Sequence, residues 1–437
     1  MRKVHFIGIG GIGVSALAKY YLKNGWQVSG SDLFSSEITN DLKSLGAKTN
    51  IGKHKGKNLV KNTNLVIYSP AVKPENPELK KARNYKIKTQ SYPQALGELT
   101  KKYFTIAVSG THGKSTTTAM IGLILKRAGF DPTVIVGTKI KEFNNSNCRV
   151  GKSKYLVIEA DEWQASFLNY WPKIIVLTNI EKEHLDYYRG LDHILKTYRK
   201  YISHLPKEGI LVADSDDTNI RQLLKKKLGF RVKKYSLKQP ETRKIKKLLK
   251  IPGIHNVSNA LAALTIARIL KISNKASLRA LSEYKGTWRR FEEREYKIPN
   301  TKYKIPIISD YAHHPTEIKA TLVATREKFK KSKVWVIFQP HQYQRTYYLF
   351  NEFTLAFNLA DEIILTDIYD VAGREEKKIK EKVSSQKLAE EVRKQGLKVH
   401  FIGNFKKIPQ FLKKRLKSND VVLIMGAGDI YKLVELL

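Results

Sequence analysis

The stretch VSGTHGKSTTTAM, residues 108–120, decides the fold class of this chain. It ends the apolar segment YFTIAVSG (103–110), which is typical of a buried strand, and it leads into a helical pattern that runs to about Ala128. A glycine-rich turn between a strand and a helix binds phosphates in nucleotide-binding α/β proteins, because its backbone N–H groups face the ligand. The turn is a shortened form, G-x-x-G-K-S, of the common phosphate-loop pattern. We therefore predict that Lys114 reaches the β- and γ-phosphate oxygens and that Ser115 ligates Mg²⁺.

A second glycine-rich turn, HFIGIGGIG (5–13), lies near the N-terminus. Gly8, Gly10 and Gly13 fit G-x-G-x-x-G between a predicted strand and a predicted helix, and Asp32 ends the next predicted strand. This is the dinucleotide-binding pattern, which favours NAD or FAD. The glycines themselves require only a diphosphate, so a UDP-sugar fits equally well, and a tight packing turn without a ligand is a further alternative.

Acidic residues follow the next two apolar strands of the central part of the chain. The segment VIEADE (157–162) places Glu159, Asp161 and Glu162 at a strand end, and TNIEKEHLD (178–186) places His184 after the following strand. Carboxylates at the carboxyl ends of parallel strands face the crevice where open α/β sheets bind ligands. Glu159 alone is equally well a helix cap and His184 alone a packing or surface histidine. Together with the phosphate loop, they predict a site for a Mg²⁺-bound nucleotide.

The pattern of apolar strands and intervening helices restarts twice along the chain, which predicts three doubly wound α/β domains. We expect their boundaries at residues 1–99, 100–287 and 288–437. The predicted strands are 3–10, 26–32, 65–72, 103–110, 154–161, 172–180, 305–315, 333–340, 361–369 and 420–429, and the strongest predicted helix is 258–270.

Composition limits the class of protein. Hydrophobic residues make up 42% of the 437 residues, and no apolar run is long enough to span a membrane. One cysteine, Cys148, allows no internal disulfide and fits a reducing cytoplasm. The net charge of +40 permits nucleic-acid binding, but the lysines are scattered and do not interleave with aromatic residues. We therefore expect a lysine-rich solvated surface and no specific nucleic-acid partner.

In their order and spacing, the motifs resemble the Mur ligases, the ATP-dependent amide-forming enzymes of peptidoglycan precursor synthesis. The resemblance runs nearly end to end and is strongest to the branch that joins L-alanine to UDP-N-acetylmuramate. It implies a Rossmann-like UDP-binding domain, a central ATPase-type domain with the phosphate loop, and a Rossmann-like C-terminal domain that binds the amino acid. The motifs that carry it are HFIGIGGIGVSALA, GTHGKSTTT, EADE, TNIEKEHLD, GIHNVSNALAA, WRRFEER, DYAHHPTE, QPHQYQRT and MGAGDI.

The resemblance assigns roles to individual residues. It implies that the UDP-sugar is bound by Gly8, Gly10, Gly11, Gly13, Ser31, Asp32 and Ser69. It implies that ATP is bound by Gly110, Thr111, His112, Gly113, Lys114, Ser115, Thr116, Asn256, Asn259, Arg290 and Asp310. It places the amino acid at Tyr311, His313, His341 and Arg345. Ser115 and Glu159 are expected to hold one Mg²⁺ and His184 a second, and the expected catalytic residues are Lys114, Glu159, His184 and Arg290.

Three positions leave details of the substrate open. Gln342 stands where relatives usually carry an arginine, Trp163 stands where a small serine is usual, and Lys196 aligns with a lysine that some relatives carbamylate. The alternatives are a Mur-type ligase for another amino acid or a recycled peptide and, outside the family, an NAD-dependent dehydrogenase. The base that deprotonates the amine is His313 or His341, and Arg374 is an alternative anchor for the amino acid. We expect a monomer or a weak homodimer.

Overall fold

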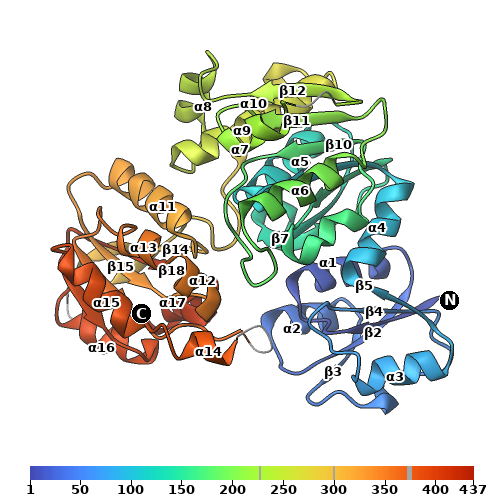
Figure 1. Cartoon of the computed structure of the whole chain (residues 1–437), viewed down its shortest axis with the longest axis horizontal. Helices are drawn as coiled ribbons and strands as arrows, with labels where there is room; N and C mark the ends of the chain where they lie inside the picture. Colours follow the sequence, from blue (N-terminus) through green and yellow to red (C-terminus); the bar gives the residue numbers. More distant parts are fainter. Residues whose placement is uncertain (226–227, 299–300, 372–375) are drawn as a thin grey trace. The chain divides into compact units, whose positions relative to one another are not determined.

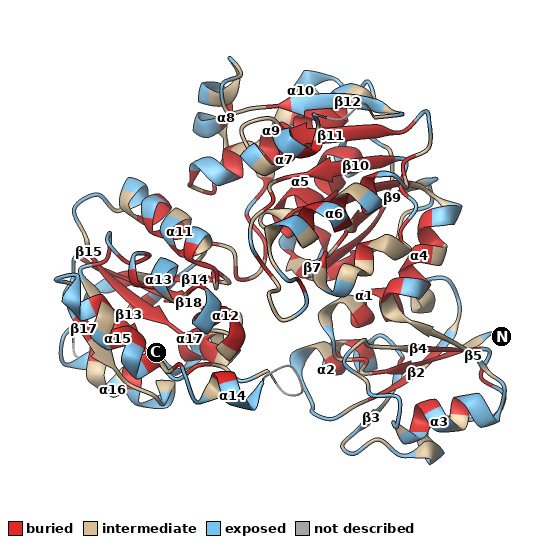
Figure 2. Ribbon diagram, in the orientation of Figure 1, coloured by how far each residue is buried: buried red, intermediate tan, exposed pale blue. Residues whose placement is uncertain are grey.

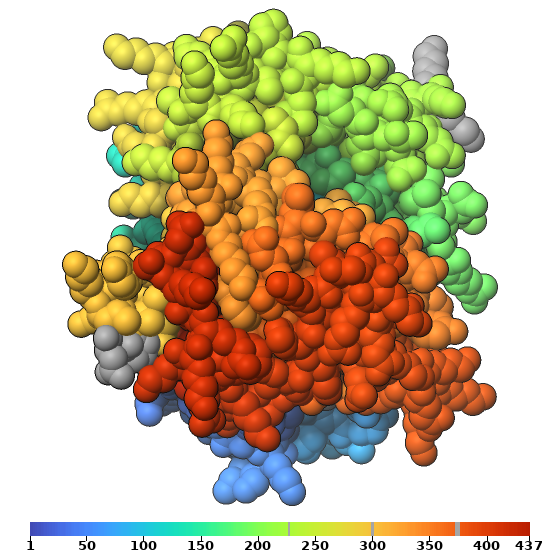
Figure 3. Space-filling view, turned by 90° about the vertical axis from the view of Figure 1, so that its left-hand side faces the viewer, coloured from blue at the N-terminus to red at the C-terminus, as the bar shows by residue number. Residues whose placement is uncertain are grey.

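The computed structural model describes residues 1–225, 228–298, 301–371 and 376–437. The chain divides into two compact units, each built around parallel β-sheet (Figure 1). Unit 1 contains Met1–Glu181, Asp192–Thr242 and Ser258–Lys285, and unit 2 contains Lys182–Leu191, Arg243–Val257 and Gly286–Leu437. In the space-filling view of Figure 3, the C-terminal residues, coloured orange to red, form one contiguous body.

The first sheet of unit 1 has five parallel strands in the order β3-β2-β1-β4-β5. The strand β1 is buried from its second residue to its last, as expected for a parallel strand with helices on both faces. The strands are β1 (Lys3–Ile7), β2 (Gln27–Asp32), β3 (Lys48–Ile51), β4 (Leu65–Tyr68) and β5 (Lys88–Ser91), and the helices are α1 (Ile12–Lys23), α2 (Glu37–Ser44), α3 (Pro77–Asn84) and α4 (Tyr92–Lys102).

The second sheet of unit 1 has seven strands in the order β12-β11-β10-β6-β9-β7-β8, with β8 antiparallel at one edge. The central position of β6 places the phosphate loop that follows it in the middle of the carboxyl edge of the sheet. The strands are β6 (Phe104–Ser109), β7 (Thr133–Ile140), β8 (Ser146–Arg149), β9 (Tyr155–Glu159), β10 (Ile174–Leu177), β11 (Ile210–Asp214) and β12 (Arg231–Tyr235), and the helices are α5 (Lys114–Arg127), α6 (Leu191–Ile202), α7 (Thr218–Leu223), α8 (Thr242–Leu248), α9 (Ile254–Ile269) and α10 (Asn274–Glu283).

The sheet of unit 2 has six strands in the order β13-β14-β18-β15-β16-β17, with β13 antiparallel at the edge. Two apolar clusters pack on the sheet, and Figure 2 shows its strands buried beneath helices with exposed outer faces. The strands are β13 (Glu292–Lys297), β14 (Lys304–Asp310), β15 (Lys333–Phe338), β16 (Glu362–Leu365), β17 (Val399–Phe401) and β18 (Asp420–Met425), and the helices are α11 (Pro315–Lys328), α12 (Tyr343–Tyr348), α13 (Phe350–Thr354), α14 (Lys377–Lys380), α15 (Ser385–Lys394), α16 (Ile408–Lys413) and α17 (Leu433–Leu436).

The predicted fold class is confirmed, since three largely parallel sheets carry the predicted α/β blocks. The predicted strands lie at the predicted places, and all but β2, which ends at Asp32 as predicted, end earlier, because the polar and glycine residues at their carboxyl ends form the turns that follow. The helix predicted from Ser258 begins at Ile254. Eight strands were not predicted. Six edge or polar strands, among them β8 and β13, lack the apolar run that signals a buried strand, whereas β7 and β11 are apolar and were overlooked.

Candidate nucleotide and amino-acid sites

The phosphate loop joins the end of β6 to the first residue of α5. Gly110 and Gly113 both have positive φ, of 134° and 81°, which residues with side chains rarely adopt. A Cβ atom on Gly110 would lie 2.1 Å from the Thr178 Oγ1, and one on Gly113 would lie 2.4 Å from the Asn259 Oδ1. These positions therefore require glycine, and α5 begins directly after Gly113, so the N–H groups of its first turn face the loop.

Two residues after β10 hold this loop in place, and the sequence analysis assigned them no role. The Thr178 hydroxyl donates to the His112 carbonyl oxygen (2.6 Å), and the Asn179 Oδ1 accepts from the His112 N–H (2.8 Å). The Thr111 hydroxyl accepts from the Glu181 N–H (2.8 Å). The sequence offered a signal for these contacts, because Thr178 and Asn179 are the first two residues of the TNIEKEHLD motif.

Lys114 is held by carboxylates at the end of β9. Its ammonium donates to the Glu162 Oε2 (2.9 Å) and to the Gly110 carbonyl oxygen (2.7 Å), and it lies 3.9 Å from the Asp161 Oδ1. Burial alone would lower the pKa of Lys114, but Glu162, Asp161 and Glu159 outweigh it and raise the pKa, so the side chain is charged. Glu162 was predicted to lie at this site with the other carboxylates of the EADE motif, but its contact with Lys114 was not predicted.

The predicted magnesium ligands of unit 1 lie together. The Ser115 hydroxyl is 3.0 and 2.9 Å from the two Glu159 carboxylate oxygens, and the Gly137 N–H donates to the Glu159 Oε2 (2.8 Å). Burial raises the pKa of Glu159, against the opposing effect of Lys114. A hydroxyl beside a carboxylate at a phosphate loop is a set of oxygen donors that suits Mg²⁺. The third predicted ligand, His184, belongs to unit 2 and has a positive φ of 54°.

The other predicted ATP residues fall in both units. Thr116 lies in the first turn of α5, and Asn259, on α9, accepts from the Thr117 hydroxyl (3.2 Å). In unit 2, the Asn256 amide donates to the Pro252 carbonyl oxygen (2.6 Å).

In unit 2, Asp310 ends β14 and Arg290 lies two residues before β13. Arg290 lies over the Tyr311 ring, 4.9 Å from its centroid, and the Asp310 carboxylate accepts from the N–H groups of Phe291 and Ala312 at 2.7 Å each. Asp310 therefore fixes the turn that carries Tyr311, and burial raises the pKa of its carboxyl group.

The first glycine turn has the predicted geometry, and Asp32 braces it. The Gly10 N–H donates to the Asp32 Oδ2 (2.8 Å), and a Cβ atom on Gly10 would lie 2.9 Å from that oxygen. A Cβ atom on Gly8 would lie 3.0 Å from the Ser69 Cβ, so the second predicted turn closes against the first. Gly11 precedes the first residue of α1, whose N-terminus thus faces the turn.

Ser31 has a structural partner that the sequence did not reveal. Its side chain is buried, and its hydroxyl donates to the Glu78 Oε2 (2.6 Å). His5 (2.9 Å) and Asn58 (2.8 Å) also bond the Glu78 carboxylate. The Ser31 hydroxyl is therefore committed to this buried network, while its carbonyl oxygen accepts from the N–H groups of Gly8 and Ile9.

The four predicted amino-acid residues lie together in unit 2. The His313 ring is 5.2 Å from the Tyr311 ring and 5.9 Å from the His341 ring, centroid to centroid. Arg345 donates through Nη1 to the His341 carbonyl oxygen (2.9 Å). Burial lowers the pKa of His313, against the opposing effect of Glu317.

Arg345 also forms an ion pair that the sequence analysis missed. Its Nε and Nη2 donate to the Glu183 Oε1 at 2.9 and 2.5 Å, and each side chain is 6% exposed. Burial alone would raise the pKa of Glu183, but Arg345 and the neighbouring histidines lower it well below its usual value. Glu183 lies next to His184 in the TNIEKEHLD motif, from which only the histidine was predicted as a site residue.

The three positions that left details of the substrate open differ in their surroundings. Gln342 is buried, with φ of 72°, directly before α12. Lys196 is exposed on α6, and Trp163 begins a short 3₁₀ segment after Glu162. Arg374 lies outside the described residues. No helix in the described part of the chain is both long and apolar enough to cross a bilayer.

Fold and site together define a nucleotide-binding α/β chain with two phosphate-binding turns and a separate cluster of histidine and arginine. Three family models match it: "Mur ligase family, catalytic domain" over residues 3–104, "Mur ligase middle domain" over 108–267 and "Mur ligase, glutamate ligase domain" over 289–428. The chain belongs to the Mur ligase family. This membership favours the ligase over the dehydrogenase that the first glycine turn suggested.

Similar proteins match along the whole chain. It is 40% identical to the UDP-N-acetylmuramate--L-alanine ligase of Acetivibrio thermocellus, over all of this chain and 95% of that protein. It is also 40% identical to the protein of the same name from Clostridium acetobutylicum, over all of this chain and 97% of that protein. The crystal structure of the Thermotoga maritima UDP-N-acetylmuramate-alanine ligase matches with a TM-score of 0.81 and 28% identity, over all of this chain and 98% of that one.

Proposed function

We propose that the chain joins L-alanine to the lactyl carboxylate of UDP-N-acetylmuramate at the expense of ATP, through an acyl phosphate. The observation that carries the proposal is the 40% identity, over the whole chain, to proteins of that activity. The phosphate loop with Lys114 at its end supplies the matching local chemistry. Domain boundaries at residues 99 and 287 are part of the proposal, and the three sheets support them.

In the first step, the lactyl carboxylate attacks the γ-phosphorus of ATP, the bond from that phosphorus to the β–γ bridging oxygen breaks, and an acyl phosphate and ADP result. Lys114 is charged and already lies against the loop carbonyls of Gly110 and Thr111. When ATP is bound, the Lys114 ammonium would move from Glu162 to the γ-phosphate. There its positive charge would offset the negative charge on the transferring oxygens. Ser115 and Glu159 would hold Mg²⁺, which supplies further charge neutralisation, and we assign His184 to a second Mg²⁺.

In the second step, the amine of L-alanine attacks the acyl phosphate and phosphate leaves. This amine must be neutral, so a base has to accept its proton. The hydrogen bonds favour His313. Its Nδ1 faces two acceptors, the Tyr311 carbonyl oxygen (3.0 Å) and the Glu317 Oε2 (3.1 Å), so Nδ1 carries the proton and Nε2 keeps the lone pair. The lowered pKa of His313 keeps the ring neutral.

His341 has the opposite arrangement. Its Nδ1 faces the Arg345 Nη1 (3.0 Å), which is only a donor, so the lone pair on Nδ1 is occupied and Nε2 carries the proton. His341 is therefore suited to donate a hydrogen bond to the substrate, together with Tyr311 and Arg345. The glycine turn at residues 8–13, with Asp32 and Ser69, would bind the diphosphate of the UDP-sugar.

One experiment tests the proposal. The protein is incubated with ATP, Mg²⁺ and UDP-N-acetylmuramate, amino acids are added singly, and phosphate release is measured. We expect release with L-alanine ahead of L-serine and glycine, because one methyl group is worth about 1–3 kcal/mol in a fitted pocket. Release only with a peptide or with a different amino acid would replace L-alanine in the proposal. We place the reaction in the cytoplasm and expect a monomer or weak homodimer.

A further inference from the structure

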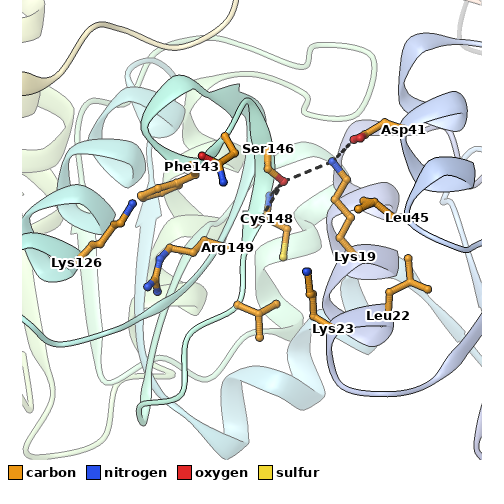
Figure 4. A pocket seen from close by; sticks show the side chains of 12 residues that line it. Lys19, Leu22, Lys23, Asp41, Leu45, Lys126, Phe143, Ser146, Cys148 and Arg149 are labelled. Atoms are coloured by element: carbon orange, nitrogen blue, oxygen red, sulfur yellow. Dashed lines mark hydrogen bonds and ion pairs between the residues drawn. The ribbon is translucent and has the colours of Figure 1, made fainter.

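A cavity of about 560 Å³ in unit 1 lies far from both phosphate-binding turns. Its walls come from α1 and the end of α2 on one side and from α5, β8 and the segment before β8 on the other (Figure 4). Lys23 ends α1, twelve residues after Gly11, and Lys126 lies twelve residues after Lys114 in α5. At the rise of an α-helix, each is about 18 Å from the turn at the start of its helix.

Four cationic side chains and one carboxylate line this cavity. Figure 4 shows Lys19 and Lys23 entering from α1, and Lys126 and Arg149 from the opposite wall. The Asp41 carboxylate lies 2.5 Å from the Lys19 ammonium. The cavity therefore has a surplus of positive charge even after this pair is counted.

Two of the cations are fixed by their neighbours. The Lys19 side chain is largely buried, and its ammonium lies between Asp41 and the Ser146 hydroxyl (3.4 Å). The Arg149 Nη2 lies 2.5 Å from the Asp131 Oδ1, and its Nη1 donates to the Pro132 carbonyl oxygen (2.5 Å). Fixed donors lose little conformational freedom when a ligand binds, which favours a preformed site.

The charges of the other two cations, Lys126 and Lys23, are not neutralised by a carboxylate within the described residues. Lys126 donates to the Glu142 carbonyl oxygen (3.0 Å), and Lys23 forms no ion pair within the described residues. Burial and the nearby charges of Arg149 and Arg127 lower the pKa of Lys126, as expected where cations repel one another. The C-termini of α1 and α5 carry partial negative charge, which would repel an anion, but this effect is confined to the last turn of each helix. Lys23 and Lys126 lie in these last turns, and their full positive charges outweigh the partial charge.

We propose that this cavity binds a small organic phosphate or diphosphate. Ammonium and guanidinium groups from opposite walls match phosphate oxygens, and the buried Phe143 with Leu22 and Leu45 offers an apolar wall to the rest of the ligand. The volume suits a metabolite, since ligand pockets measure about 300–1,000 Å³. A cavity with walls on two sides favours a metabolite over a nucleic-acid backbone, which follows an extended groove.

The cavity borders the contact between α1 and β8. The Asn147 amide of β8 donates to the Ile12 carbonyl oxygen (2.6 Å) and to the Ser15 hydroxyl (2.9 Å), both in the first turns of α1. A phosphate held by Lys23 and Arg149 would join the same two elements toward the other end of the helix. The ligand would thus stiffen the helix that carries the first glycine turn.

Titration calorimetry with inorganic pyrophosphate tests the site on the full chain, with an ATP analogue present at saturation. The test variant carries Lys23→Gln and Lys126→Gln, and the matched control carries Lys200→Gln and Lys275→Gln, which remove two exposed lysines from other helices of unit 1. We expect the test variant to lose one site or to raise its Kd by at least about 10-fold, since charge-assisted hydrogen bonds are lost. The control should bind as the unmodified protein does.

Equal weakening in both variants would show diffuse surface charge and would overturn the proposal, as would unchanged binding in the test variant. Effects seen with a single-stranded oligonucleotide but not with pyrophosphate would assign the surface to nucleic acid instead. The measurement needs no turnover, so it is separate from the proposed ligase activity. All four lysines are exposed, and their replacement should leave the fold intact.

Discussion

Replacing Arg345 with alanine should destabilise unit 2 as well as weaken the binding of L-alanine. The guanidinium uses four of its N–H groups within the protein, two to Glu183 and two to His341. Each side chain of the Arg345–Glu183 pair is 6% exposed, so the mutation leaves the Glu183 carboxylate buried without its counter-ion. Glu183 must then stay ionised while buried, with the His184 N–H (3.1 Å) and the His314 ring (3.9 Å) beside it, or take up a proton.

The magnitude follows from the burial of the pair. Removing one partner of a buried ion pair costs about 3–5 kcal/mol, because the desolvated charge that remains is uncompensated. An exposed pair of the same unit is a matched control, since Lys394 and Glu391 are 69% and 42% exposed. Lys394→Ala should cost less than about 1 kcal/mol.

Urea unfolding, followed by circular dichroism, measures the difference. The double variant Glu183→Gln with Arg345→Ala should be more stable than Arg345→Ala alone, because it removes the buried charge. If Arg345→Ala unfolds at the urea concentration of Lys394→Ala, or if the double variant recovers nothing, the pair does not carry the energy assigned to it. Well below the unfolding transition, the KM for alanine should rise far more than the KM for ATP, and an unchanged KM for alanine would remove Arg345 from the substrate site.

Four further predictions concern other parts of the molecule. Lys114→Ala should lower turnover by at least about 10³-fold with the fold intact, and near-normal activity would end the assignment of the ATP site. His313→Gln should abolish the fall of kcat at low pH, which arises because activity is lost as the pH drops through the lowered pKa of His313; the same loss in His341→Gln instead would reverse the assignment of the base. Calorimetry should show that UDP-N-acetylmuramate binds the first glycine turn, whereas micromolar binding of NAD alone would favour a dehydrogenase. Burial opposes ionisation of Glu78, but hydrogen bonds from His5, Ser31 and Asn58 lower its pKa from 4.5 to about 2. The carboxylate therefore stabilises the first sheet above about pH 4.5, and about 3 kcal/mol is lost as the pH falls toward 2, so unfolding of Glu78→Gln should depend less steeply on pH over this range than unfolding of the unmodified protein.

The sequence predicted those features that depend on one short segment. The glycines of both turns were recognisable because positive φ and close approach exclude other residues, as Gly110 and Gly113 show. Most central strands were recognisable as apolar runs, since helices cover both faces of a parallel sheet, although the apolar strands β7 and β11 were overlooked. The edge strand β13, with the sequence EEREYK, carries no such run and is held by antiparallel pairing with β14.

The partners of the site residues could not be predicted in the same way, because they depend on which segments the fold brings together. The family resemblance implied that Ser31 binds the UDP-sugar, yet its hydroxyl bonds Glu78, which follows 47 residues later in the chain. Likewise, Glu183 and Arg345 are 162 residues apart, and only the folded chain shows them in contact. A carboxylate in a motif is thus visible from the sequence, whereas its counter-ion is not.

The sequence also could not show which of His313 and His341 is the base, because this depends on where each ring carries its proton. Histidine is a common general base, and both residues follow the carboxyl ends of apolar strands, β14 and β15, of one sheet. What separates them is the neighbour of each Nδ1, two acceptor oxygens for His313 and an arginine donor for His341. Because Glu183 fixes the arginine, it also helps to fix the proton of His341. The charge of Glu183 also raises the pKa of the neighbouring His313, so Glu183→Gln should lower that pKa further and move the fall of kcat to lower pH. An unchanged pH profile would show that the ion pair is purely structural.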